Sequence, residues 1–121
     1  MLKTILVVDD SAAIRQMLHL LLQSAGYQVI EAIDGADGVQ KAMQQSVDLV
    51  LSDFNMPHMD GLALVQALRN TAVHKTTPIL QLTTESAPAL KQQGKSAGAT
   101  GWITKPFLPE RLLEVVHNVL N

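Results

Sequence analysis

Four apolar segments of strand length in this sequence are each followed, or closed, by side chains that can take part in polar chemistry. The residues at these ends are Asp9 and Asp10, Asp53, Thr83, and Lys105. If the four segments are parallel strands of one sheet, these side chains meet at its carboxyl edge, where open α/β sheets bind ligands. Three acids and one lysine would then share a small volume. This combination indicates an aspartate that can be phosphorylated, beside a divalent cation.

Gathering three carboxylates has a large electrostatic cost. At separations of about 5 Å and an effective dielectric near 20, each pair repels by roughly 3 kcal/mol, or about 10 kcal/mol in all. One lysine offsets only part of this repulsion, so a cation or protonation must supply the rest. Hard oxygen ligands with open water positions favour Mg²⁺. Because phosphoryl transfer depends on alignment and charge neutralisation, an acid nucleophile, a metal, a lysine and a hydroxyl are a sufficient set.

Each of these residues also has an ordinary structural explanation. Asp9 and Asp10 precede a predicted helix, whose N-terminal dipole favours acids. Asp53 could be a turn former, and a single lysine such as Lys105 is most often a surface residue. All of these explanations would have to apply at separate strand ends that the fold brings together. The combination therefore favours a functional site.

The elements that must position these residues follow from the alternation of short apolar segments with segments of helical period. This alternation is typical of βαβ units and a parallel sheet. The predicted strands cover residues 4–8, 28–32, 48–52, 78–83 and 101–104. Since right-handed crossovers place helices on both faces, we predict an α/β fold with a doubly wound five-stranded parallel sheet, a three-layer (βα)5 domain of flavodoxin-like type.

The helix after the first strand has the clearest pattern. Its apolar residues recur three and four positions apart, with Ser11 placed to cap its start and Gly26 its end. The second helix, near 36–45, is predicted to bury Val39, Ala42 and Met43, and the third, near 62–70, to bury three apolar residues. A fourth helix, 89–97, is weakened by its glycine, and a last one begins at Pro109. The apolar positions of the first, third and last helices are Ile14, Met17, Leu18, Leu21, Leu22; Leu64, Val65, Leu68; and Leu112, Leu113, Val116, Leu120.

The composition excludes several classes of function. The 121 residues, 47% of them hydrophobic, suit one compact domain, and the lack of cysteine excludes disulfides and thiol catalysis. We find neither a signal peptide nor a membrane span, so the protein is expected in the cytoplasm. A net charge of −2 with thinly spread Lys and Arg argues against nucleic acid as a partner. The histidines lack the spacing of metal ligands and are interpreted as surface or structural residues; they are His19, His58, His74 and His117.

From about Lys3 to Leu120 the chain resembles the response-regulator receiver domains of two-component signalling. The resemblance depends on four segments in order, Val7-Val8-Asp9-Asp10-Ser11, Ser52-Asp53-Phe54-Asn55-Met56-Pro57-His58-Met59-Asp60-Gly61, Leu82-Thr83 and Lys105-Pro106-Phe107. Within the family the chain is most similar to the single-domain chemotaxis receivers of CheY type, because Asp53 to Pro57 and Glu85 match that branch. The resemblance implies one receiver domain over residues 1–121 with no output domain.

The resemblance also implies a role for each acid. Asp53 would accept the phosphoryl group from the phosphohistidine of a histidine kinase. Asp10 would bind Mg²⁺ directly, and Asp9 would do so directly or through water. The backbone carbonyl of Asn55 would complete the protein ligands. The domain would support its own phosphorylation and dephosphorylation without turning over an external substrate, so it is not expected to be an enzyme in the usual sense.

The remaining family positions would sense or tune the phosphoryl group. The Thr83 hydroxyl and the Thr84 backbone N–H would bond its oxygens, and Lys105 would pair with it across an expected cis Lys105–Pro106 bond. Side chains of Asn55 and Glu85 would tune how readily water attacks the acyl phosphate. Trp102 stands at the switch-aromatic position, where Tyr or Phe is usual, and its larger indole leaves open whether it turns inward or is a plain core residue.

The implied partners are a histidine kinase of CheA type and an output target such as a flagellar motor switch or a phosphatase. The target would contact the face formed by the fourth helix, fifth strand and fifth helix, and the chain is expected to be a monomer. A receiver in a non-chemotactic phosphorelay and a phosphorylation-independent pseudo-receiver stay as alternatives. A dehalogenase-type phosphatase is disfavoured because Asn55 replaces its second acid. A flavin carrier is disfavoured because two acids occupy the place of its phosphate-binding loop.

Overall fold

The computed structural model describes residues 2–54, 61–84, 95 and 97–121. Five parallel strands form one sheet in the order β2-β1-β3-β4-β5. The strands are β1 (Thr4–Val8), β2 (Gln28–Ala32), β3 (Leu49–Asp53), β4 (Ile79–Thr83) and β5 (Gly101–Thr104). Each lies within one residue of its predicted bounds, so the sequence pattern located the whole sheet.

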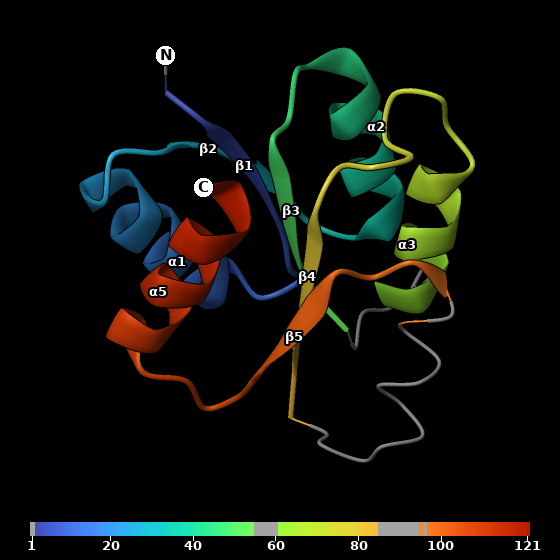
Figure 1. Cartoon of the computed structure of the whole chain (residues 1–121). Helices are drawn as coiled ribbons and strands as arrows, with labels where there is room; N and C mark the ends of the chain where they lie inside the picture. Colours follow the sequence, from blue (N-terminus) through green and yellow to red (C-terminus); the bar gives the residue numbers. More distant parts are fainter. Residues whose placement is uncertain (1, 55–60, 85–94, 96) are drawn as a thin grey trace.

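Helices cover both faces of this sheet, with α1 and α5 on one side and α2 and α3 on the other (Figure 1). Their bounds are α1 (Ala12–Ser24), α2 (Gly35–Gln44), α3 (Gly61–Arg69) and α5 (Pro109–Leu120). Of the predicted fourth helix, only Lys95 and Ala97 lie in the described part of the chain, and both are helical. The predicted three-layer, flavodoxin-like α/β fold is confirmed.

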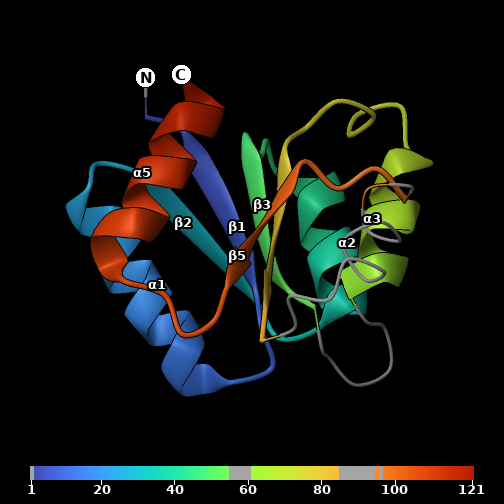
Figure 2. The same ribbon diagram turned by 60° about the horizontal axis from the view of Figure 1, so that its bottom comes forward.

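The direction of the strands separates the chain ends from the carboxyl edge of the sheet. All five strands run the same way, with their carboxyl ends toward the bottom of Figure 1. Helix α5 follows β5 and returns along the sheet, so the N and C labels both lie at the opposite end, as Figure 2 also shows. The residues predicted to carry the chemistry therefore lie far from both ends of the chain.

Both ends of α1 have the predicted caps. The Ser11 hydroxyl oxygen accepts the backbone N–H of Ile14 at 3.3 Å, which satisfies one of the free donors of the first turn. At the other end Gly26 has a φ of +98°, a left-handed conformation that disfavours residues with a Cβ. Its N–H donates to the Gln23 carbonyl, and the Tyr27 N–H donates to the Leu22 carbonyl. These two hydrogen bonds form a Schellman motif, which turns the chain into β2.

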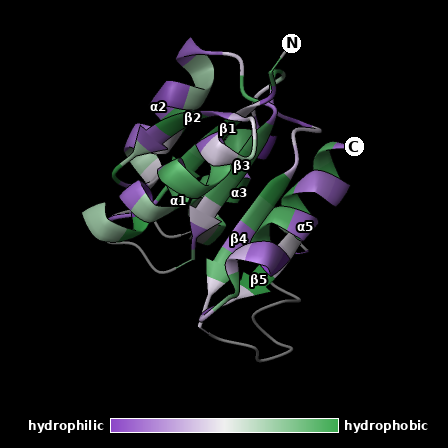
Figure 3. Ribbon diagram, turned by 90° about the vertical axis from the view of Figure 1, so that its left-hand side faces the viewer, coloured by the Kyte–Doolittle hydropathy of each residue, from purple (hydrophilic) through white to green (hydrophobic). Residues whose placement is uncertain are grey.

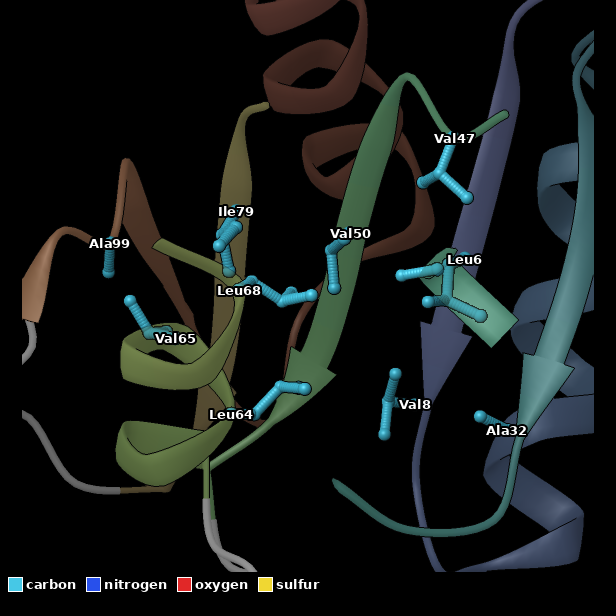
Figure 4. Packing of buried hydrophobic residues seen from close by; sticks show 11 residues of the cluster. Leu6, Val8, Ala32, Val47, Val50, Leu64, Val65, Leu68, Ile79 and Ala99 are labelled. Atoms are coloured by element: carbon cyan, nitrogen blue, oxygen red, sulfur yellow. The ribbon is translucent and has the colours of Figure 1, made fainter. Parts of the chain in front are cut away.

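The core between the sheet and the α2–α3 layer consists of aliphatic side chains. Figure 4 shows Leu64, Val65 and Leu68 of α3 lying against the strands, as their spacing predicts. Helix α2 packs closely on β1 at Gly38, where an added Cβ would lie 3.0 Å from a Val8 methyl carbon. A larger residue at position 38 would push on the end of β1, next to Asp9.

The second core lies between the sheet and the α1–α5 layer. Leu18 and Leu22 of α1 and Leu112 and Val116 of α5 are fully buried there. The central strands are accordingly hydrophobic, whereas the helices carry hydrophilic segments (Figure 3). The predicted burial of Met43 in α2 is wrong: its side chain is 49% exposed. Met43 follows the buried Ala42 directly, and one residue turns a helix by about 100°, away from the sheet.

His74 and Gln81 are two of the buried polar residues. His74 is a structural residue, with Nε2 2.7 Å from the Ala42 carbonyl and Nδ1 2.9 Å from the Thr77 hydroxyl. Gln81, in the middle of β4, is fully buried, and in the described structure neither amide atom has a hydrogen-bond partner. In the part of the chain that the structure describes, no helix is long and apolar enough to cross a membrane.

Replacing Gln81 by methionine is expected to raise the free energy of unfolding. Methionine is of similar size, and it removes two buried polar atoms whose lack of partners costs about 1–3 kcal/mol. Urea denaturation should show a higher midpoint with an unchanged slope. The neighbouring substitution Leu80→Met, which removes no polar group, should be neutral or slightly destabilising. Equal stability of Gln81→Met and the parent chain would contradict an unsatisfied amide.

Candidate functional site

Strand register brings the predicted site residues together at the carboxyl edge of the sheet. Val8 of β1 lies beside Ser52 of β3, so the next residues, Asp9 and Asp53, are neighbours. Asp53 in turn pairs with Leu82 of β4, the residue before Thr83. The connections that follow β1 and β3 leave in opposite directions from this point, because the first leads to β2 on one side of the pair and the second leads to β4 on the other. Such a switch point is where open α/β sheets bind ligands.

Three carboxyl groups converge here. Asp9, Asp10 and Asp53 each offer an oxygen atom that lies within 4.8 Å of those of the other two. Asp9 and Asp53 are buried, whereas Asp10 is exposed. At this separation two full charges repel by about 3 kcal/mol at an effective dielectric near 20. The structure thus contains the charge cluster that the sequence predicted.

Lys105 provides the positive charge of the cluster. Its Nζ donates to Asp53 Oδ1 at 3.1 Å and lies 3.8 Å from Asp9 Oδ2. The Lys105 backbone N–H donates to the Thr83 carbonyl at 2.7 Å, which extends the pairing of β4 and β5 to the site. The Lys105–Pro106 peptide bond is cis, as the family resemblance implied.

Asp9 carries the main electrostatic strain. Burial raises the pKa of its carboxyl group above the usual range, and the charges of Asp53 and Asp10 raise it further. The Ser11 backbone N–H, which donates to Asp9 Oδ1 at 2.8 Å, and Lys105 act in the opposite direction. Asp9 Oδ2 is buried, and within the described structure it has no hydrogen-bond partner, because 3.8 Å to Lys105 is too long. A hard divalent cation fits this donor set, since it would satisfy that oxygen and neutralise the acids.

The other predicted site residues differ in their burial and in whether the structure describes them. Thr83 is buried at the end of β4, and Thr84 beside it is exposed. Trp102 is half-buried on β5 and lines a surface groove with Phe107, Leu108 and other α5-side residues. Asn55 and Glu85 lie outside the described residues, so their predicted roles stay predictions.

Sequence reasoning missed Arg15. Its Nη1 donates to the backbone carbonyl of Asp9 at 2.8 Å, and its Nε lies 3.3 Å from Glu31 Oε1. A signal was available, because a cation near the start of a helix opposes the helix dipole and requires specific partners to compensate. Hydrophobic periodicity gave no indication of those partners.

The comparison with known families agrees with this geometry. Residues 5–117 match the sequence model of the response regulator receiver domain. The chain belongs to the response-regulator receiver family. This match identifies the chain as the receiver domain of a two-component response regulator. The strand order of the receiver, which flavodoxin and CheY share, agrees with the fold of that family.

Solved structures and relatives of known sequence are similar to the receiver over nearly its whole length. The chemotaxis protein CheY4 of Vibrio cholerae is 49% identical with a TM-score of 0.96, over 99% of this receiver and 100% of that chain. Protein PilH of Pseudomonas aeruginosa is 37% identical over 96% of each chain. The transcriptional regulatory protein ResD of Bacillus subtilis is 38% identical over 96% of the receiver, which spans only 47% of ResD. The chain thus spans about half the length of that relative.

One of the similar solved structures contains a metal ion. It is the receiver domain of the sensor histidine kinase PA1611 of Pseudomonas aeruginosa, with a magnesium ion coordinated in the active site cleft. This domain is 26% identical to the receiver, with a TM-score of 0.90 over 99% of the receiver and 98% of that chain.

Proposed function

We propose that the receiver accepts a phosphoryl group on Asp53 from the phosphohistidine of a histidine kinase, in a reaction that requires Mg²⁺. The observation that supports this most strongly is the buried carboxylate of Asp53 beside two further acids, with Lys105 Nζ 3.1 Å away. Such a carboxylate is a suitable nucleophile, because its neighbours hold it in one place and one lysine offsets the incoming negative charge.

The transfer step exchanges one bond to phosphorus for another. An Asp53 carboxylate oxygen forms a bond to phosphorus while the phosphorus–nitrogen bond to the donor imidazole breaks, and the electron pair stays with the imidazole. The product is an acyl phosphate on Asp53. Lys105 already lies against this carboxylate and would donate to a phosphoryl oxygen. The Thr83 hydroxyl and the Thr84 backbone N–H are the further donors that we propose.

Asp9, Asp10 and Asp53 would hold the metal, together with the Asn55 carbonyl. When bound, Mg²⁺ would supply positive charge to the acids and to the phosphoryl group in transfer. Two findings support this assignment: the Asp9 oxygen that has no hydrogen-bond partner among the described residues, and the magnesium ion in the related PA1611 receiver. The residues themselves contribute position, because paired strands of one sheet place Asp9 and Asp53 side by side.

The output would be a change of the face around β5 and α5, which controls a partner protein. Trp102 lies on this face beside a groove, and we propose that it changes environment when Thr83 contacts the phosphoryl group. A chemotaxis-type pathway, with a kinase of CheA type and a target such as a flagellar motor switch or a phosphatase, is supported by the similarity to CheY4. A non-chemotactic phosphorelay is the alternative. Action as a monomer in the cytoplasm stays a prediction.

Phosphorylation can be tested with the purified receiver, Mg²⁺ and acetyl phosphate. We expect intact-mass spectrometry to show the addition of one phosphoryl group. The same incubation with a chelator should show little or none, because the acids then repel the donor. A sample without donor is the control. Labelling that is equal with and without Mg²⁺, or absent in both, would contradict the proposed function.

A further inference from the structure

The side chain of Arg15 connects the acid cluster to strand β2. Arg15 lies in the first turn of α1, and its side chain is only 15% exposed. Its Nη1 donates to the Asp9 carbonyl at 2.8 Å, while its Nε faces Glu31 Oε1 at 3.3 Å. The guanidinium holds its donors in a rigid planar fork and can fix two such partners in set directions, whereas a lysine offers a single flexible ammonium group.

Asp9 is fixed by three hydrogen bonds that leave one oxygen for the site. Its N–H donates to the Ala32 carbonyl at 3.1 Å, its Oδ1 accepts from the Ser11 N–H at 2.8 Å, and its carbonyl accepts from Arg15. Oδ2 is then directed toward the cluster, 3.8 Å from Lys105. Of these three bonds, that of Arg15 is the one made by another residue's side chain, so a substitution can remove it selectively.

Glu31 in turn orients Arg15. Its second carboxylate oxygen lies 2.8 Å from His19 Nδ1, and its backbone carbonyl accepts from Lys41 Nζ at 2.7 Å. The Arg15–Glu31 pair therefore links α1 to β2, and Lys41 links Glu31 to α2. Because both partners of Arg15 are held by other elements, the guanidinium has little freedom to leave the Asp9 carbonyl.

We propose that Arg15 is a positioning residue: through the Asp9 carbonyl, and with Glu31 as its anchor, it holds Asp9 in the orientation that binds Mg²⁺. This inference rests on the proposed function, since it concerns the same metal site. The charge of Arg15 opposes the binding of a cation, so its contribution is geometric. Charge and geometry therefore predict opposite effects when Arg15 is replaced.

The test is a titration of Mg²⁺ alone, with affinity taken from the rise of the thermal unfolding midpoint. We expect Arg15→Gln to bind Mg²⁺ several-fold to about tenfold more weakly, as when a partner outside the ligand set is lost. If the charge mattered more, Arg15→Gln would bind more tightly. Arg15→Lys keeps the charge but loses the fork, so it should also bind more weakly. Arg111→Gln, which removes the same charge from an exposed arginine of α5 that pairs with Glu114, is the matched control with parental affinity.

Two further measurements separate positioning from a general loss of structure. Glu31→Gln should weaken Mg²⁺ binding in the same direction, and its effect should not add to that of Arg15→Gln. At saturating Mg²⁺ the labelling rate of Arg15→Lys with acetyl phosphate should return to near the parental rate. If the parent chain binds no Mg²⁺, the proposed function fails. If the parent binds Mg²⁺ and both Arg15 variants bind it equally or more tightly, the inference about Arg15 is overturned.

Discussion

Asp53→Asn is expected to abolish phosphorylation of the receiver while leaving its fold intact. The amide has the same shape as the carboxylate and can still accept a hydrogen bond from Lys105, but it is not a nucleophile toward phosphorus. We expect no added mass with acetyl phosphate and Mg²⁺ under conditions in which the parent chain is fully labelled. Circular dichroism should show unchanged secondary structure.

Glu114→Gln is the control for this substitution. Glu114 is an exposed acid of α5 that pairs with Arg111, so its loss changes the net charge by the same amount away from the acid cluster. We expect parental labelling for this variant. Substantial labelling of Asp53→Asn at the parental rate would show that another residue accepts the phosphoryl group.

Asp9→Asn is expected to stabilise the metal-free receiver and to remove its response to Mg²⁺. The substitution removes a buried charge that is repelled by Asp53 and Asp10, whereas the amide oxygen can keep the bond from the Ser11 N–H. Repulsion of about 3 kcal/mol per pair, partly offset by Lys105, predicts a net gain of roughly 1–2 kcal/mol. For a chain of this size that raises the unfolding midpoint by roughly 4–8 °C.

Thermal unfolding of the parent chain and the variant, each with chelator and with Mg²⁺, checks both parts of this prediction. The parent midpoint should rise with Mg²⁺, whereas the midpoint of Asp9→Asn should not change. Asp10→Asn is the matched variant at an exposed acid, and we expect a smaller gain because water screens its charge. A lower midpoint for Asp9→Asn in chelator would show that Asp9 contributes more through bonds than it costs through repulsion.

The pKa of Asp9 also predicts a pH dependence in chelator. Its folded-state pKa is raised above the usual 3.8, mainly by burial, so the folded state binds this proton more tightly than the unfolded state. The stabilisation from protonated Asp9 is therefore present below pH 3.8 and is lost as the pH rises through the folded-state pKa. The free energy of unfolding of the parent minus that of Asp9→Asn, measured across pH in chelator, should fall over this range.

The sheet could be predicted from the sequence because its signals are local. Short apolar segments located all five strands, and the fold class followed from their alternation with helical segments. The caps of α1 at Ser11 and Gly26 were predicted for the same reason, since side-chain capping and a left-handed glycine involve only neighbouring residues. The meeting of Asp9, Asp10 and Asp53 then followed from the parallel arrangement.

Features that depend on contacts between elements were harder to predict. Met43 was assigned to the core by its apolar character, but the rotation of α2 is set by the close approach of Gly38 to Val8. The role of Arg15 depends on Glu31, sixteen positions away in β2, and no spacing rule connects the two. The unsatisfied amide of Gln81 also appears only once the layers enclose it.

The position of the chain ends has a practical consequence for protein engineering. Helix α5 carries the chain back from the carboxyl edge, so both ends lie on the side opposite to Asp53 (Figures 1 and 2). A fluorescent protein, an affinity tag or a surface tether can therefore be fused at either end without blocking the approach of a phosphate donor. The same arrangement would let a biosensor read phosphorylation through a linker while the fusion stays away from the acid cluster.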